Sequence, residues 1–160
     1  MSLKIVVTGA AGFIGSHTVD HLLQVGNIVL GVDNFRTGIR SNLVPALGNA
    51  RFTLCEIDVL DEPAFSEIVA NFRPDAIIHL AALVSVPESI ANPTLNHRLN
   101  FQSTEAVAEA ARLHRVPRIV FASSAAVYGD PTYTPISENG PTQPLSCGDP
   151  PKTRPLVMLV

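Results

Sequence analysis

The sequence has few of the residues that stabilise small disulfide-rich or metal-binding proteins. Its 160 residues include only two cysteines, Cys55 and Cys147, and its five histidines do not cluster with them at ligand spacing. Two thiols so far apart suggest neither a disulfide framework nor a thiolate metal site. We therefore expect no structural metal.

Strong net charge and long apolar runs are also missing. The formal net charge is −3, so no nucleic acid or other polyanion is indicated as a partner. The longest apolar stretches hold five or six residues, well below the roughly 18 to 20 that cross a bilayer. The N-terminus lacks the basic and then apolar pattern of a signal peptide. We expect a cytoplasmic protein without a membrane partner.

Short runs rich in valine and isoleucine alternate with helical patterns over the first 130 residues. The runs are typical of buried strands and lie at 4–8, 27–32, 51–57, 76–81 and 118–123. Apolar residues at steps of three and four predict helices over 13–25, 61–72 and 95–114. Asp61 and Pro63 fit the start of the second helix. This alternation predicts an α/β fold, a parallel sheet with helices on both faces.

The first predicted strand runs directly into a turn that contains three regularly spaced glycines, Gly9, Gly12 and Gly15. Gly9 permits the sharp turn, Gly12 lets backbone approach a pyrophosphate, and Gly15 lets the next helix pack close to the sheet. The amides and the positive dipole end of that helix would stabilise anionic charge. A plain tight turn is the alternative, but the position between strand and helix favours dinucleotide binding.

A carboxylate follows the second predicted strand and indicates which dinucleotide binds. Asp33 lies eighteen residues after Gly15, where an acid accepts hydrogen bonds from the adenosine ribose hydroxyls and repels a 2′-phosphate. NAD is therefore favoured over NADP. Arg36 leaves the alternative open, since a guanidinium three residues later can meet a 2′-phosphate. Asp33 can also be a simple loop cap.

Several segments together resemble one family. They are TGAAGFIGSH (8–17), VDNFRTG (32–38), IDVLD (57–61), IIHLAALVSVPES (77–89), Asn100 and VFASSAAVYGD (120–130). With these segments the sequence resembles the NAD-dependent epimerase/dehydratase family of extended short-chain dehydrogenases, most closely its UDP-glucose 4-epimerase branch. The resemblance covers about residues 3–146. It implies a Rossmann-type doubly wound parallel sheet in a three-layer αβα arrangement.

The resemblance also assigns cofactor-binding residues. Phe13 and Ile14 would line the pyrophosphate turn, and the other contacts would come from the ends of later strands. These are Asp33 and Asn34 at the adenosine ribose, Asp58 and Val59 beside adenine, Leu80, Ala81 and Ala82 under sugar and phosphate, and Asn100 near the nicotinamide half.

Structural alternatives exist for several of these residues. Asp58 can cap a strand end, Ala81 and Ala82 can allow close helix packing, and Asn100 can cap a turn. His79 lies within an apolar strand, and a hydrogen-bonded core histidine is the favoured interpretation there over a catalytic one.

Chemistry in this family is a hydride shuttle to and from the nicotinamide, with a tyrosine as the base and a lysine four residues later. Ser124 matches the family's hydroxyl residue after the fifth strand, although its side chain can instead satisfy a backbone group. No Tyr-x-x-x-Lys occurs in the 160 residues, whose only lysines are Lys4 and Lys152. Cys147 stands near the expected tyrosine position, among prolines that disfavour a helix.

The resemblance therefore implies an incomplete member of the family. We expect a NAD-binding Rossmann domain over 1–130, truncated after about the fifth strand, an irregular Pro-rich tail over 131–160, and no C-terminal substrate domain. The expected function is the NAD-binding portion of a nucleotide-sugar epimerase, inactive alone. A non-catalytic NAD(H)-binding module or another NAD-dependent nucleotide-sugar dehydratase or reductase is the alternative. An unpaired sheet edge would favour a homodimer.

Overall fold

The fold is built on a five-stranded parallel sheet. A computed structural model describes residues 2–144 of the chain. The sheet order is β3-β2-β1-β4-β5, and every neighbouring pair is parallel. The strands are β1 (Lys4–Thr8), β2 (Ile28–Val32), β3 (Phe52–Cys55), β4 (Ala76–His79) and β5 (Ile119–Phe121). The prediction of a parallel α/β sheet is confirmed.

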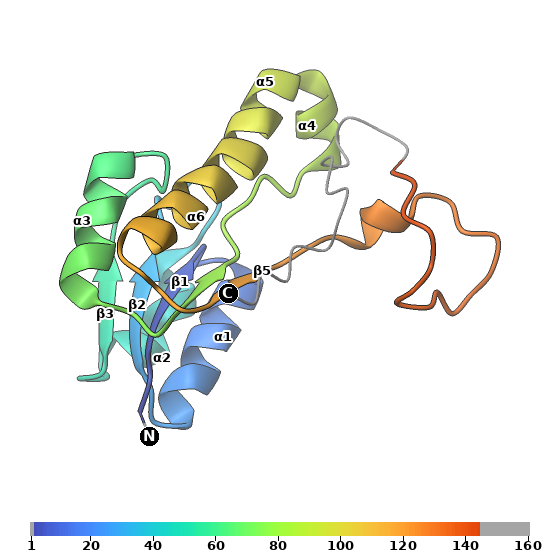
Figure 1. Cartoon of the computed structure of the whole chain (residues 1–160). Helices are drawn as coiled ribbons and strands as arrows, with labels where there is room; N and C mark the ends of the chain where they lie inside the picture. Colours follow the sequence, from blue (N-terminus) through green and yellow to red (C-terminus); the bar gives the residue numbers. More distant parts are fainter. Residues whose placement is uncertain (1, 145–160) are drawn as a thin grey trace.

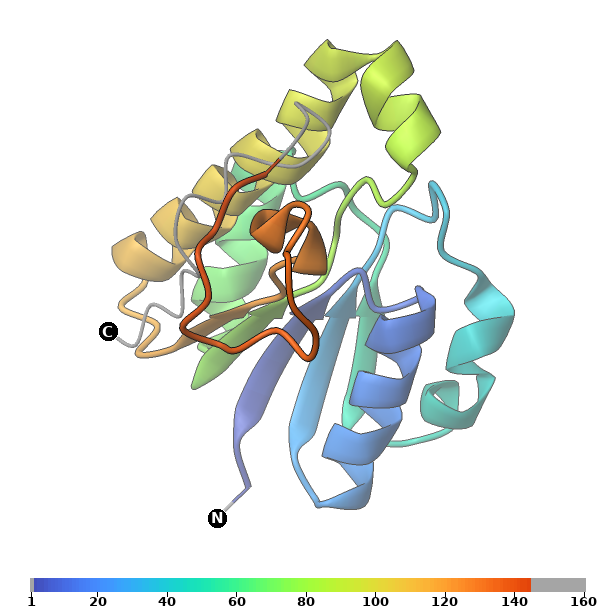
Figure 2. The ribbon, with the colours of Figure 1, turned by 90° about the vertical axis from the view of Figure 1, so that its right-hand side faces the viewer.

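Helices cover both faces of this sheet, as Figure 2 shows in edge view. One side carries α1 (Phe13–Gln24), the 3₁₀ turn η1 (Arg40–Leu43) and α2 (Val44–Leu47). The other side carries α3 (Glu62–Phe72) and α6 (Ser103–Leu113). A second group of helices extends beyond the carboxyl ends of the strands (Figure 1): α4 (Val86–Ala91), α5 (Pro93–Asn96) and the π-helical segment η2 (His97–Gln102).

The two cores follow from the alternation of side chains along the strands. On β1, Val6 joins a cluster with Phe65 of α3 and Val107 of α6. Its neighbours Ile5 and Val7 point the other way, into a cluster with α1 and α2. Each strand therefore needs apolar residues at consecutive positions, which is why the strands appear as continuous apolar runs in the sequence.

The ends of the elements differ from the sequence-based prediction in a consistent way. All five strands exist, but β3, β4 and β5 end two residues earlier than predicted, because the chain leaves the ladder to form loops at the carboxyl edge. The second helix starts as predicted: the Asp61 side chain accepts a hydrogen bond from the Ala64 amide, and Pro63 lies in the first turn.

The predicted helix over 95–114 is one helical run from Pro93 to Leu113 that contains the π-helical segment η2. The sequence analysis did not predict α2, α4 or the two 3₁₀ turns, η1 and η3 (Ala125–Tyr128). These elements have four to six residues each, which is too short for a hydrophobic period to be seen.

The described part of the proline-rich tail, residues 131–144, contains no helix or strand. The prediction that Cys147 stands near a missing catalytic tyrosine lies outside the described residues, and the domain boundary near residue 130 stays a prediction. No helix within residues 2–144 has the length and apolarity needed to span a membrane.

Candidate functional site

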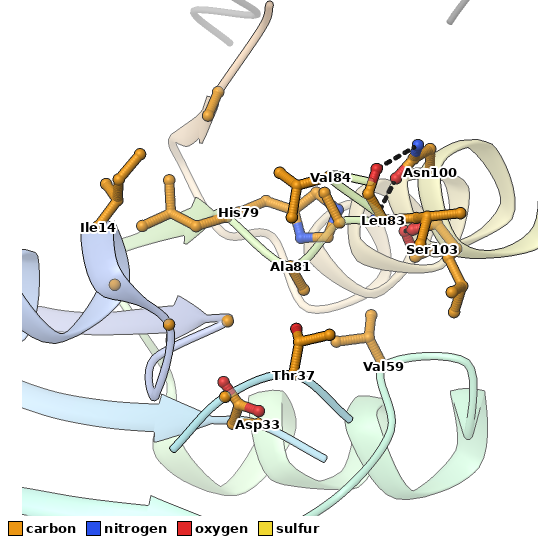
Figure 3. A pocket seen from close by; sticks show the side chains of 18 of the residues that line it. Ile14, Asp33, Thr37, Val59, His79, Ala81, Leu83, Val84, Asn100 and Ser103 are labelled. Atoms are coloured by element: carbon orange, nitrogen blue, oxygen red, sulfur yellow. Dashed lines mark hydrogen bonds between the residues drawn. The ribbon is translucent and has the colours of Figure 1, made fainter. Parts of the chain in front are cut away.

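A cavity of about 510 Å³ opens at the carboxyl edge of the sheet. This is the edge at which parallel α/β sheets bind ligands, beside the point where the strand order reverses. Here β1 lies between β2 and β4, and the loops after these strands form the walls (Figure 3). The cavity is lined by every site residue predicted from the sequence: Gly9, Gly12, Phe13, Ile14, Gly15, Asp33, Asn34, Asp58, Val59, Leu80, Ala81, Ala82, Asn100 and Ser124.

The glycine turn after β1 has no room for side chains at two of its three glycines. Gly9 has a φ of +69°, and an added Cβ would lie 2.7 Å from the Ala81 amide nitrogen. A Cβ at Gly15 would lie only 2.0 Å from the Gly9 carbonyl oxygen. At Gly12 the nearest atom, the Gly9 oxygen, is 3.3 Å away. Glycine at positions 9 and 15 is therefore required by the packing, whereas Gly12 keeps bare backbone at the cavity wall.

The N-terminus of α1 points its amides toward the same wall. Gly12 is the N-cap residue, so no side chain caps the helix, and the first turn holds no acidic residue. The backbone amides of the first turn have no intrahelical acceptor in any α-helix. The Gly12 amide donates to the Gly9 carbonyl at 3.1 Å, so the partial positive charge of the following amides, at Phe13 and Ile14, together with the helix dipole, favours an anion at this point.

Asp33 is held by the backbone of two loops. It is 8% exposed, and its Oδ2 accepts a hydrogen bond of 2.8 Å from the Ala11 amide. Its Oδ1 accepts one of 2.8 Å from the Phe35 amide. The carboxylate thereby joins the glycine turn to the loop after β2. Each oxygen keeps a further lone pair that can accept a ligand hydroxyl.

Asn34 and Asp58 continue this wall toward β3. The Asn34 side-chain amide donates to Asp58 Oδ2 at 3.0 Å, while Asp58 Oδ1 accepts from the Leu60 amide at 2.9 Å. The interpretation of Asp58 as a cap of its own loop is therefore correct as far as its Oδ1 is concerned. Its Oδ2 nevertheless lies at the cavity side, bonded to the neighbouring loop.

A buried Thr8–His79 pair connects the ends of β1 and β4. Thr8 Oγ1 lies 2.7 Å from His79 Nδ1 and accepts hydrogen bonds from the Leu80 and Ala81 amides. His79 is 2% exposed, as expected for a core histidine, yet it also lines the cavity.

Asn100 holds the opposite wall, as the dashed lines in Figure 3 show. Its Oδ1 accepts from the Leu83 amide at 2.7 Å, and its Nδ2 donates to the Leu83 carbonyl at 3.2 Å. A third bond, of 2.7 Å, joins Nδ2 to Asn96 Oδ1. Asn100 lies in the π-helical segment η2, a type of irregularity that often marks functional positions. It fixes the loop that follows β4.

Ser124 follows β5 and is exposed at the cavity. Its Oγ accepts a hydrogen bond of 3.2 Å from the Ala126 amide at the start of η3. The backbone-capping interpretation is thus correct for the oxygen. Since the hydroxyl proton is not used in that bond, Ser124 retains a donor for a ligand oxygen.

Sequence reasoning missed about half of the cavity wall. The missed residues include Thr37, Leu83, Val84, Val86, Leu99, Ser103 and Phe121. Thr37, Leu83 and Val84 come from the same strand-end loops as predicted residues, so the sequence could have indicated them. The other four lie in α4, η2, α6 and β5. Arg36 also lines the cavity and pairs with Glu88 of α4.

The described residues contain no cluster that could hold a metal ion near this cavity. Within residues 2–144 no three His, Cys, Asp or Glu residues lie close enough together to hold a metal ion. Burial raises the pKa of the Cys55 thiol above its ordinary value, and this side chain packs against the core on the α3 and α6 side. The arrangement is thus suited to bind a polar, anionic ligand with apolar parts.

The chain was compared with known families, proteins and structures. The family model described as "NAD dependent epimerase/dehydratase family" matches residues 5–152. The UDP-glucose 4-epimerase of Mycolicibacterium smegmatis is 41% identical over 145 residues, which are 90% of this chain and 46% of that protein.

Solved structures agree with this match. The crystal structure of UDP-glucose 4-epimerase from Brucella ovis in complex with NAD has a TM-score of 0.86 and 34% identity, over 95% of this chain and 45% of that one. The Bifidobacterium longum UDP-glucose 4-epimerase in complex with NAD+ and UDP has a TM-score of 0.82 and 36% identity, over 88% of this chain and 42% of that one. The chain therefore spans less than half of the length of each of these three proteins.

Proposed function

The chain belongs to the NAD dependent epimerase/dehydratase family, and on that premise we propose that it is the NAD-binding portion of a nucleotide-sugar epimerase. The observation that carries this proposal is the convergence of all fourteen predicted site residues on one cavity. The family relatives named above include epimerases crystallised with NAD and with UDP.

The residues of the cavity fit NAD from its pyrophosphate to its adenosine. The bare backbone at Gly12 and the unpaired amides at the start of α1 suit two phosphates. Asp33, positioned by the Ala11 and Phe35 amides, has lone pairs available for a ribose diol. The cavity volume lies within the range of about 300–1,000 Å³ that is usual for small-molecule and cofactor sites.

The chemistry of the proposed epimerase requires a hydride acceptor and a hydrogen-bond donor to the sugar. A bound nicotinamide supplies the acceptor that takes up and returns hydride. Ser124 donates its hydroxyl proton to the reacting sugar oxygen while its Oγ accepts from Ala126. The 160 residues contain no Tyr-x-x-x-Lys, so this stretch lacks the paired base of the family.

Calorimetric titration with NAD tests the binding proposal. Gly12→Val places a branched side chain at the cavity wall, 3.3 Å from the Gly9 oxygen at its Cβ. We expect NAD affinity to fall by at least about tenfold, or about 1.4 kcal/mol. Gly48→Val is the matched control, because an added Cβ there meets nothing within 4 Å. Unchanged affinity in a folded Gly12→Val protein would contradict the proposal.

An activity measurement separates the two classes of function. The 160-residue chain loaded with NAD is expected to show no reduction near 340 nm and no epimer after UDP-glucose or UDP-galactose is added. The reason is that Ser124 has no base partner, and the loss of a general acid–base group costs on the order of 10² to 10⁴ in rate. NAD binding without turnover in a chain that carries the remaining half of the family length would favour a non-catalytic NAD(H)-binding module.

A further inference from the structure

An ion pair joins Arg36, which lines the cavity, to a carboxylate on helix α4 that does not line it. The Arg36 guanidinium, on the loop after β2, bonds to the Glu88 carboxylate on α4, 52 residues away in the sequence. Their side chains are 33% and 37% exposed. Among the described residues that line the cavity, Arg36 is the one arginine or lysine. Its charge is therefore the main local attraction for an extra phosphate at this end of the cavity.

The backbone on both sides of the pair is fixed, so that only the side chains are free to rearrange. Asn34 Oδ1 accepts a hydrogen bond from the Arg36 amide at 3.0 Å, and the preceding residue, Phe35, is held in the same way by Asp33. On α4, the Glu88 amide donates to Ser85 Oγ at 3.3 Å, and Pro87 lies in the first turn. The pair is thus set between two rigid anchor points.

Glu88 occupies a position where its carboxylate has an ordinary alternative role. Ser85 and Glu88 have the spacing of a capping box, in which the acid reaches back to the amide of the N-cap residue. In this protein the Glu88 carboxylate bonds to Arg36 instead. Glu88 therefore holds the guanidinium of Arg36, from another loop, and does not cap its own helix.

The location of the pair gives it a consequence for cofactor choice. Asp33 faces the adenosine ribose in the proposed function, and Arg36 follows it by three residues. A guanidinium that turned toward the cavity would stabilise a ribose 2′-phosphate, which carries up to two negative charges. While Glu88 neutralises the guanidinium and holds it at α4, Asp33 alone determines the potential at the 2′ position.

We propose that Glu88 is a positioning residue for cofactor selection, which keeps Arg36 away from a ribose 2′-phosphate and so favours NAD over NADP. This inference rests on the proposed function, since it concerns the same cavity. It extends that function, because the preference is assigned to an ion pair between the loop after β2 and helix α4, in addition to the acid at the end of β2.

Paired titrations with NAD and NADP at low ionic strength test the inference. The proteins are the wild type, Glu88→Gln, Arg36→Gln and the double variant. We expect Glu88→Gln to raise NADP affinity relative to NAD by about three- to tenfold, the scale of a partly exposed ion pair. In the Arg36→Gln background the same substitution should leave the ratio unchanged, because the freed cation is then absent.

Glu56→Gln is the matched control. Glu56 pairs with Arg40, and neither residue lines the cavity. This pair is more exposed than Arg36–Glu88, with side chains 56% and 59% exposed. This control variant should leave the ratio of NADP affinity to NAD affinity at the wild-type value.

Two results would overturn the inference. One is a ratio of NADP to NAD affinity that does not change in Glu88→Gln. The other is a ratio that changes equally with and without Arg36. If NAD binds and only the ratio fails to move, the proposed function stands and this inference falls. If the wild type binds neither dinucleotide, both fall.

Discussion

The two ends of the cavity differ in how firmly their residues are held. The end proposed to bind adenosine, called the adenosine end below, is formed by the glycine turn, Asp33, Asn34 and Asp58. It is held by backbone contacts and by carboxylates that each accept two hydrogen bonds. The β5 end, formed by Ala122, Ser123, Ser124 and Ala126, is largely exposed. Ser124 is held there by one side-chain bond of 3.2 Å.

This difference separates the residues proposed to bind the cofactor from Ser124, which is proposed to bond to the sugar. The residues named for the adenosine end all lie within the first 60 residues, after β1, β2 and β3, so its geometry depends mainly on two crossovers between neighbouring strands. The β5 end borders a strand that pairs on one side only within residues 2–144. A ligand held at the rigid end can therefore be retained while the groups at the other end are rearranged or exchanged, and the four predictions below test this contrast.

The largest effect is expected at Gly15, in the rigid end. Gly15→Ala adds a Cβ that would lie 2.0 Å from the Gly9 oxygen, so α1 must move away from the turn. We expect NAD binding to be lost and the free energy of unfolding to fall by about 3 kcal/mol, measured by urea denaturation. Gly48→Ala, in open space, should change stability by less than about 1 kcal/mol. Equal effects of the two substitutions would show that the turn is not rigid.

Asp33→Asn should have the next largest effect. An asparagine side chain has one acceptor oxygen, so one of the Ala11 and Phe35 amides would face an NH₂ group in a site that is 8% exposed. We expect a loss of stability of about 1–3 kcal/mol and weaker NAD binding. Asp130→Asn, at an exposed position beyond β5, is the control. Unchanged thermal and calorimetric behaviour of Asp33→Asn would contradict the account of that carboxylate.

A smaller effect is expected at the sheet edge. Val120 is 48% exposed on β5, and an unpaired edge with an apolar side chain favours association between chains. We expect self-association at micromolar concentration, weakened by about tenfold in Val120→Lys, since a charged edge residue opposes strand pairing. Sedimentation velocity measures this. A compact monomer of the wild-type chain would exclude it.

The smallest effect is expected for Ser124→Ala. The side chain is exposed and makes one bond to the Ala126 amide, which water can replace. Stability should change by less than about 0.5 kcal/mol, and NAD affinity should stay near the wild-type value. A large change in either quantity would show that the β5 end is as tightly built as the adenosine end, and the contrast would fail.

Local signals account for what the sequence could predict. The glycine turn, the acid after β2 and the Asp61 cap of α3 each depend on residues within one or two turns of chain. The carboxyl-edge position of the site follows from parallel strands, whereas the predictions of distant residues such as Asp58 and Asn100 came from the resemblance to the family, and both line the same cavity.

Features that depend on three-dimensional proximity or on short elements could not be predicted. The Arg36–Glu88 pair spans 52 residues, and no pattern indicates which carboxylate meets which guanidinium. The π-helical segment around Asn100 keeps an apolar repeat that is indistinguishable from an ordinary helix. Helix α4 does carry a local signal, Ser85 with Glu88 and Pro87 between them, but its six residues hold too few turns for a hydrophobic period.

The position of β1 at the centre of the sheet has a kinetic consequence. Its pairing with β2 joins segments about 24 residues apart, whereas its pairing with β4 joins Thr8 to His79. Closing the longer loop between β1 and β4 costs more chain entropy and slows the formation of that strand pair. During synthesis from the N-terminus, β1, β2 and β3 can pair before β4 has been made. We therefore expect the cavity to form late, when β4 inserts beside β1 and its loop meets the glycine turn.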